Sequence, residues 1–182
     1  RQLGRVTGRQ HEAIAPRVAV PSRDGYRFGG YFTGQEGEGA CYYDKDGAAV
    51  LAEEPSSLSR PLYAYWEKLP QTKVSFDANK GSGGQGSTVT TTYGSAMPAI
   101  STTKPTRAGY AFQGWYDNAN YATSGAKQYY TAEGKSARNW DKEVATATLY
   151  AGWKGNDIAL AWDSCGGSKV AATTQAYSDG AK

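Results

Sequence analysis

The sequence predicts a β-rich α+β protein built from small modules in tandem, and three observations support this fold class. A Gly- and aromatic-rich segment occurs twice, as PSRDGYRFGGYF over residues 21–32 and as PTRAGYAFQGWY over residues 105–116. A second segment recurs at a similar spacing, as LYAYW over residues 62–66 and as LYAGW over residues 149–153. The chain also holds 23 Gly and 14 Tyr among 182 residues, a composition that favours tight turns and strands with aromatic cores. Self-similarity at a spacing of about 85 residues is typical of a tandem array.

The repeat predicts three parts. Residues 1–69 form a first, incomplete repeat, residues 70–155 a complete second repeat, and residues 156–182 the first hairpin of a third. In the first part, Tyr26 and Phe28 alternate as residues on one face of a strand do. Gly30 permits a bend before the next two aromatic residues. A short helix is expected over residues 48–54, and a strand over residues 61–66 closes the repeat.

The second repeat shows the whole pattern. The strand-like runs 74–78 and 88–94 flank a Gly-rich turn and predict a β-hairpin. A crossover containing Pro98 leads to the aromatic segment, which is followed by a long polar loop and by Tyr129 and Tyr130. A short helix is expected over residues 134–140, before the last strand over residues 147–153. The third part opens at Ile158 with IALAWDSCGG, which aligns with VSFDANKGSGG in the second repeat.

Composition excludes several classes of function. The net charge of +3 arises from 20 basic and 17 acidic residues with no Lys/Arg run, so we expect no nucleic-acid partner. No apolar stretch is long enough to cross a bilayer, so we expect no membrane insertion. The lone histidine, His11, lies in a polar segment without a convergent acid–base set, so the sequence predicts neither an enzyme nor a cofactor.

The combined motifs of the second repeat identify a family. A hairpin beginning VSFDAN, the PTRAGYAFQGWY segment and the closing LYAGW together resemble the Listeria–Bacteroides repeat, the B repeat of the Listeria internalins. The resemblance covers nearly all of residues 73–153 and parts of residues 21–66 and 158–182. It implies a β-grasp-like module in which a small mixed sheet curls over a short helix or connector. It also implies secreted or surface-anchored bacterial proteins whose modules act as spacers or adhesive stalks.

Three segments that could bind small ligands have simpler interpretations. Residues 81–86 satisfy GxGxxG, but a strand-like TVTTTYG follows where a dinucleotide site needs a helix. The oxygen-rich strings at residues 44–47 and 117–120 do not continue to the ligand set that calcium requires. We therefore interpret all three as turns, and the sequence predicts no metal site.

The aromatic pairs leave two roles open. Adjacent residues of a strand point to opposite faces, so one ring of each pair could remain exposed and stack on a sugar. Core filling is the competing interpretation, because aliphatic residues are scarce. The candidates for ligand stacking are Tyr42, Tyr43, Trp115, Tyr129 and Tyr130.

The two cysteines, Cys41 and Cys165, have no spacing typical of a zinc or redox motif. The first repeat lacks an initial strand in this sequence, and the third supplies one without a body. One hypothesis is that residues 158–182 of one subunit complete the first repeat of the next subunit by strand addition, with an intersubunit disulfide between Cys41 and Cys165. The alternative is that the chain is an excerpt of a longer array.

These features predict an extracellular, secreted or cell-surface structural protein: a stalk, spacer or fibre segment with adhesive potential. The expected partners are neighbouring repeats or identical subunits. The alternative function is a surface module in which exposed aromatic rings bind cell-wall or host glycans or a host protein.

Overall fold

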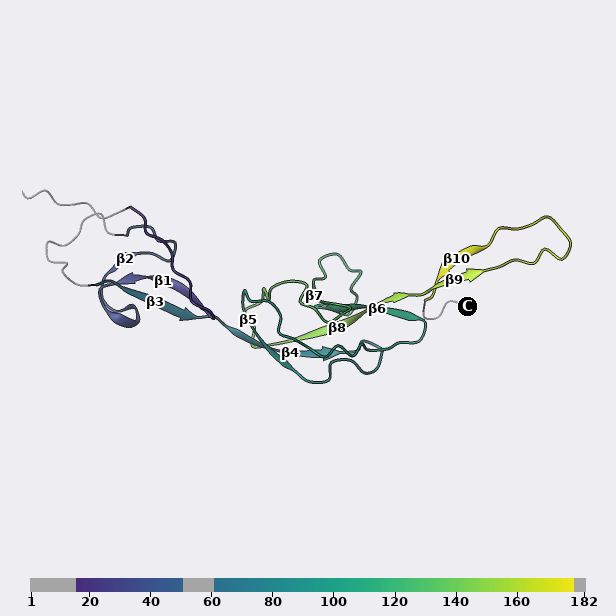
Figure 1. Cartoon of the computed structure of the whole chain (residues 1–182), viewed down its shortest axis with the longest axis horizontal. Coiled ribbons are helices and arrows are strands. Elements are labelled where there is room, and N and C mark those ends of the chain that lie inside the picture. The colour runs from purple at the N-terminus through teal and green to yellow at the C-terminus, as the bar shows by residue number, and fades with distance from the viewer. Residues whose placement is uncertain (1–15, 51–60, 179–182) are drawn as a thin grey trace, which may run out of the picture. The chain divides into compact units, whose positions relative to one another are not determined.

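The computed structural model describes residues 16–50 and 61–178, and the chain divides into two compact units between Leu69 and Pro70. The described residues are β-rich, as predicted, and Figure 1 shows them as strands joined by long irregular segments. The α component of the prediction is wrong for residues 134–140, which form no helix. That segment runs beside a strand instead, where the N–H of Ala137 donates to the carbonyl of Tyr129 at 2.9 Å. Residues 48–50 are not helical either, and residues 51–54 and His11 lie outside the described residues.

The second unit contains a five-stranded mixed sheet in the order β5-β4-β8-β6-β7. β4 and β8 are parallel neighbours at its centre, and the other pairs are antiparallel. β4 and β5 form the hairpin predicted from the sequence, and a long connector without a helix leads from β5 to β6. The strands are β4 (Gln71–Asp77), β5 (Val89–Thr92), β6 (Tyr110–Tyr116), β7 (Gln128–Thr131) and β8 (Thr146–Gly155).

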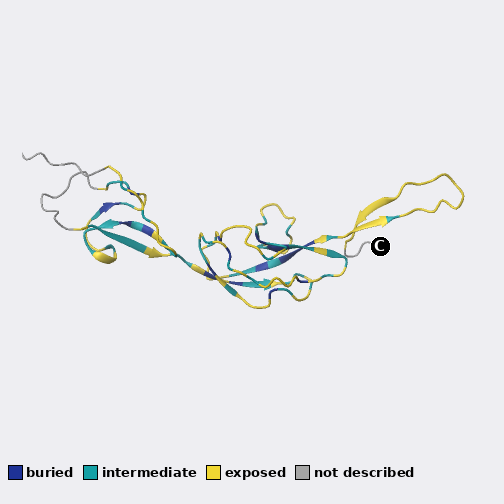
Figure 2. Ribbon diagram, in the orientation of Figure 1, coloured by how far each residue is buried: buried dark blue, intermediate teal, exposed yellow. Residues whose placement is uncertain are grey.

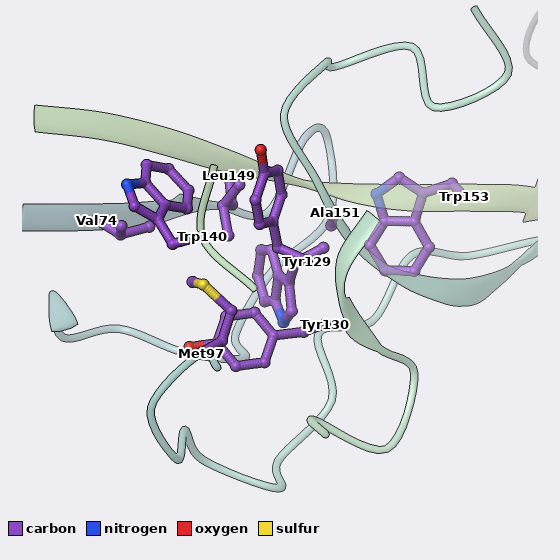
Figure 3. Close-up of a cluster of buried hydrophobic side chains, with 9 residues drawn as sticks. Val74, Met97, Tyr129, Tyr130, Trp140, Leu149, Ala151 and Trp153 are labelled. Atoms are coloured by element: carbon purple, nitrogen blue, oxygen red, sulfur yellow. The ribbon is translucent and has the colours of Figure 1, made fainter. Parts of the chain in front are cut away.

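One face of this sheet carries an aromatic core (Figure 3). Tyr129 and Tyr130 are adjacent on β7, yet neither is exposed to solvent. Trp140 packs against Tyr129 with ring centroids 4.9 Å apart, and its indole N–H donates to Thr72 Oγ1 at 2.8 Å. The hydroxyl of Tyr130 donates to the carbonyl of Pro98 at 2.8 Å. Irregular segments on both sides of β7 therefore bury both rings and satisfy their polar atoms. The buried cluster comprises Val74, Met97, Trp115, Tyr129, Tyr130, Trp140, Leu149, Ala151 and Trp153.

The first unit contains a three-stranded antiparallel sheet in the order β2-β1-β3. Its strands are β1 (Tyr26–Phe32), β2 (Cys41–Tyr43) and β3 (Tyr63–Lys68), and a 3-10 turn, η1, spans Gln35–Gly37. Phe28 on β1 pairs with Trp66 on β3, and Tyr31 pairs with Tyr43 on β2. The second unit has matching pairs. Phe112 on β6, at the position of Phe28, pairs with Trp153 on β8, and Trp115, at the position of Tyr31, pairs with Tyr130 on β7.

Both sheets contain a bulge at a glycine with positive φ. Gly30 has φ 132° and Gly114 has φ 123°. A Cβ atom at either position would collide with a backbone carbonyl of the neighbouring strand, that of Tyr43 or of Tyr130. Glycine is therefore required for both the conformation and the close approach of the strands.

A third pair of strands, β9 (Asp157–Leu160) and β10 (Thr173–Ala176), forms a separate hairpin within the second unit. Ile158 pairs with Gln175 in this hairpin, just as Thr72 pairs with Thr91 in the β4–β5 hairpin. Both hairpins are therefore in the same register. Figure 2 shows that the residues of β9–β10 are nearly all exposed, whereas β4 contains buried positions.

Candidate functional site

The five aromatic residues proposed for ligand stacking are all buried. Their exposed fractions range from 0% for Tyr129 and Tyr130 to 7% for Tyr43. Phe76 packs edge-on against Trp115 with centroids 5.1 Å apart, and it also contacts Tyr130. The stacking role is therefore corrected in favour of core filling, since rings at these depths offer no face to a sugar. The corrected set is Tyr42, Tyr43, Trp115, Tyr129 and Tyr130.

The two cysteines occupy different environments. Cys41 begins β2 and is partly buried, and its thiol donates to the carbonyl of Tyr43 at 3.3 Å. Burial, followed by the nearby Asp44 carboxylate, raises the pKa of the Cys41 thiol. Cys165 is exposed in the β9–β10 loop with φ 49°. Both are free thiols in this chain, and their intersubunit pairing remains a prediction.

The glycine motif and the oxygen-rich strings have structural roles. Ser82 forms a backbone bridge with Thr106, and the chain after residue 86 enters β5 rather than a helix. Asp44 Oδ1 accepts hydrogen bonds from the backbone N–H groups of Asp46 and Ala48, both at 2.9 Å. Among residues 16–50 and 61–178, no group of three or more His, Cys, Asp or Glu side chains could hold a metal ion.

An open groove of about 680 Å³ runs along β4 and β8, and its lining includes Trp140 and Leu149 of the aromatic cluster. Strands β4 and β8 position its lining, because alternate residues of each strand point away from the buried ones. Ser75 Oγ and Thr148 Oγ1 lie 3.0 Å apart in this lining. Lys73 and Tyr150 also line the groove. The sequence analysis missed this surface, although the alternation of polar residues with the core positions of β4 and β8 could have indicated it.

Charged groups form the rim of the groove. Lys142 Nζ lies 2.8 Å from Asp117 Oδ2, and both residues line it. The neighbouring Asp141 accepts hydrogen bonds from Lys127 and from the hydroxyl of Tyr129. Partial burial acts to raise the pKa of Asp141, but the hydrogen bonds from Lys127 and Tyr129 outweigh it and lower the pKa overall. Burial and the bond to Asp141 raise the pKa of Tyr129. The groove therefore offers hydroxyl groups, one tyrosine and paired charges.

The β9–β10 hairpin presents a second surface. Trp162 is 54% exposed and Ile158 is 44% exposed. Val170 is 51% exposed and Tyr177, just after β10, is 39% exposed. These four apolar side chains are therefore open to solvent over part of their surface in the residues that the structure describes.

One known family matches the part of the chain that forms the five-stranded sheet. Residues 73–152 match the family model of the Listeria-Bacteroides repeat domain. This part of the chain is a Listeria-Bacteroides repeat domain. The match begins in β4 and ends in β8, so it contains the parallel pair at the centre of the five-stranded sheet.

Two relatives from Evansella cellulosilytica are similar over more of the chain. One, whose name describes it as a Gly-rich membrane protein, is 31% identical over 157 residues, which is 86% of this chain and 17% of the relative. The other, whose name describes it as a membrane protein, is 32% identical over 120 residues, which is 64% of this chain and 15% of the relative. The chain thus spans less than a fifth of the length of these relatives. No solved structure matches it.

A search of the described residues for helices long and apolar enough to cross a membrane finds none.

Proposed function

We propose that this chain is a structural segment of a bacterial surface protein, in which β-grasp-like Listeria–Bacteroides repeats in tandem act as a spacer or stalk. The strand order supports the β-grasp assignment, since the first and last strands of the repeat, β4 and β8, pair in parallel, with β5 on one side and the β6–β7 hairpin on the other. The shared register and bulges of the two sheets support the tandem arrangement. The repeat family and the membrane-protein names of the relatives support a surface location.

The parallel pairing of β4 with β8 is the observation that carries the mechanical role. β4 is the first strand of the repeat domain and β8 is the last, and five residue pairs align between them, from Lys73 with Thr146 to Asp77 with Tyr150. Tension applied to the two ends of the domain would slide these strands past one another. Their hydrogen bonds would then share the load instead of opening one at a time.

The connection to the next hairpin fits the same role. A single residue, Asn156, separates β8 from β9, and its N–H donates to the carbonyl of Gly109 at 2.9 Å. In the first unit, the N–H of Leu69 after β3 donates to the carbonyl of Gly25 at 2.9 Å. Each closing strand is therefore anchored, within its own unit, at the turn before an aromatic strand.

Single-molecule force spectroscopy of the full chain, held at its two ends, tests the spacer role. We expect the 73–152 domain to unfold in one event that releases roughly 270 Å of chain. Substituting Ser75 and Thr148 together by proline, which disrupts the β4–β8 ladder, should lower the unfolding force, whereas proline at the exposed Ser168 should not. Unfolding of the unmodified chain without a measurable force peak would contradict the mechanical role.

The groove along β4 and β8 supports a second candidate, binding of a cell-wall or host glycan. Its lining brings Tyr150, Lys73 and the hydroxyl groups of Ser75 and Thr148 to one open surface. Titration with soluble peptidoglycan fragments and host glycans, followed by tryptophan fluorescence, would detect this binding. The candidate predicts that Tyr150→Ala abolishes the response and that Tyr177→Ala, a substitution outside the groove, does not. Equal responses from the two variants would contradict it.

A further inference from the structure

We propose that the second unit binds an acidic sugar, one that carries a carboxylate, in a small cavity beside the end of β8. The cavity has a volume of about 340 Å³ and lies where the turn after β4, the turn before β6 and the loop after β6 meet. It shares no lining residue with the groove along β4 and β8. We call it the basic corner, and its lining includes Asn79, Lys80, Arg107, Asn120, Tyr121 and Trp153.

Two cationic side chains line the basic corner. The guanidinium carbon of Arg107 lies 3.8 Å from the ring centroid of Tyr110, a stack that orients the arginine. Lys80 is exposed and has φ 68°. The side-chain amide of the preceding Asn79 anchors this turn, because it donates to two backbone carbonyls at 2.6 and 2.8 Å. Among the described residues the lining contains no acidic side chain. The corner therefore presents positive charge that is already positioned.

The first unit has an equivalent corner. Arg23 stacks on Tyr26, with its guanidinium carbon 4.0 Å from the ring centroid. The turns before the two aromatic strands match, because in each the tyrosine N–H donates to the arginine carbonyl, at 3.0 and 3.1 Å. Trp66 lines a cavity together with Arg23, as Trp153 does with Arg107. The arginine and the tryptophan are thus placed by features that both units share.

A carboxylate of the chain itself lines the cavity of the first unit. Glu36 lies there together with Arg23. The loops over residues 33–40 and 117–127 correspond, since the N–H of each first residue donates to the carbonyl of the last, at 3.0 and 3.1 Å. Glu36 and Asn120 are each the fourth residue of their loop. The second unit therefore has a neutral side chain where the first has a carboxylate, and a ligand carboxylate can take that place.

An aromatic ring at the corner suits a sugar. Tyr121 is partly buried and packs on Tyr116, with ring centroids 5.2 Å apart. Trp153 is 8% exposed, too deep to stack, and its indole N–H donates to the carbonyl of Ala78 at 3.0 Å. Small-molecule sites combine aromatic side chains with a few placed charged groups. A carboxylate-bearing sugar offers an apolar ring face to Tyr121 and an anion to the two cations.

Isothermal titration calorimetry of the full chain with oligogalacturonate, a sugar oligomer whose only charges are carboxylates, tests the proposal. Lys80→Gln should weaken binding about tenfold, because it removes a charge-assisted contact. Lys73→Gln removes the same charge from an exposed residue of the groove along β4 and β8, and it should leave the affinity unchanged. Equal losses would indicate attraction by overall charge and would overturn the proposal. Absence of binding to the unmodified chain would also overturn it.

A second pair of variants tests the position of the anion. Asn120→Glu gives the second unit the carboxylate of the first, and it should weaken binding about tenfold or more, because like charges repel at a contact. Ser124→Glu adds the same charge at an exposed position of the same loop outside the corner, so it should have little effect. Equal effects of the two substitutions would contradict the proposed position.

A comparison of ligands tests the chemical class. Neutral galactose oligomers should not bind, and a glycerol phosphate oligomer should bind more weakly than oligogalacturonate, because the corner of the first unit accommodates a carboxylate. Amide NMR shifts on binding should concentrate at residues 79–80 and 119–121. Tighter binding of the phosphate oligomer, or shifts confined to the groove along β4 and β8, would overturn the assignment. The spacer role would stand in either case, since the force measurement tests it separately.

Discussion

The two units share one strand arrangement but differ in how well it is covered. In the second unit the β4–β5 hairpin covers the aromatic strands, and Trp115 is 3% exposed. In the first unit the corresponding Tyr31 keeps the same pairing register but is only partly buried. Register therefore depends on the strands themselves and on the glycine bulges, whereas burial depends on the additional hairpin. The strands and bulges therefore specify the sheet, and the additional hairpin stabilises it by burying the aromatic rings.

The largest expected effect comes from removing the matched rings. Trp115→Ala should destabilise the second unit by about 3–5 kcal/mol, because it leaves a large cavity in a closed core. Tyr31→Ala should cost the first unit about half as much, because solvent already reaches that ring. Urea unfolding followed by hydrogen-exchange mass spectrometry reports on the two units separately. Equal losses of stability in the two units would contradict the conclusion that Tyr31 is less well covered than Trp115.

Alanine substitution at the glycine bulges should destabilise both units by similar amounts. Gly114→Ala and Gly30→Ala each place a Cβ against a neighbouring carbonyl at positive φ, which should cost about 1–3 kcal/mol. Gly86→Ala is the control, because its Cβ would meet no atom within 4 Å and its φ lies outside the positive range. Denaturant midpoints measure the effect. A tolerated alanine at one bulge only would show that the two sheets do not share this feature.

A smaller effect is expected at the turns that follow β2 and β7. Asp44 Oδ1 accepts from two backbone N–H groups, and Thr131 Oγ1 accepts from those of Glu133 and Lys135 at the matching positions. Removing either side chain with alanine should cost about 1 kcal/mol. Thermal unfolding of the two variants checks this value. The two turns would not be equivalent if Asp44→Ala were neutral and Thr131→Ala were not.

The smallest effect is a pH dependence at Asp141 in the second unit. Its pKa is lower in the folded chain than its ordinary value of 3.8. The carboxylate therefore stabilises the fold fully above about pH 4 and loses this contribution as the pH falls through the folded pKa. Asp141→Asn should lower the melting temperature at pH 7 by a few degrees, and the difference should shrink toward pH 2. A constant difference over this range would exclude the proposed hydrogen bonds as its cause.

The sequence predicted the aromatic strands and their hairpins because the same aromatic and glycine residues recur at a spacing of about 85 residues. It did not predict that both Tyr129 and Tyr130 are buried, since the irregular segments that cover β7 have no periodic pattern. The helix expected over residues 134–140 fails because that segment pairs instead with its neighbours, as in the bridge between Tyr130 and Ser136. The groove was missed because its lining joins residues of β4 and β8 that are far apart in the sequence.

Amide hydrogen exchange measured by NMR at low concentration tests most directly whether one aromatic-packed sheet is used twice. The account predicts slow exchange at the same inward positions of both units, with Phe28 and Trp66 protected as Phe112 and Trp153 are, and weaker protection throughout the first unit. Exchange of β1 and β3 at the rate of an unstructured peptide, beside a protected β6 and β8, would contradict the account.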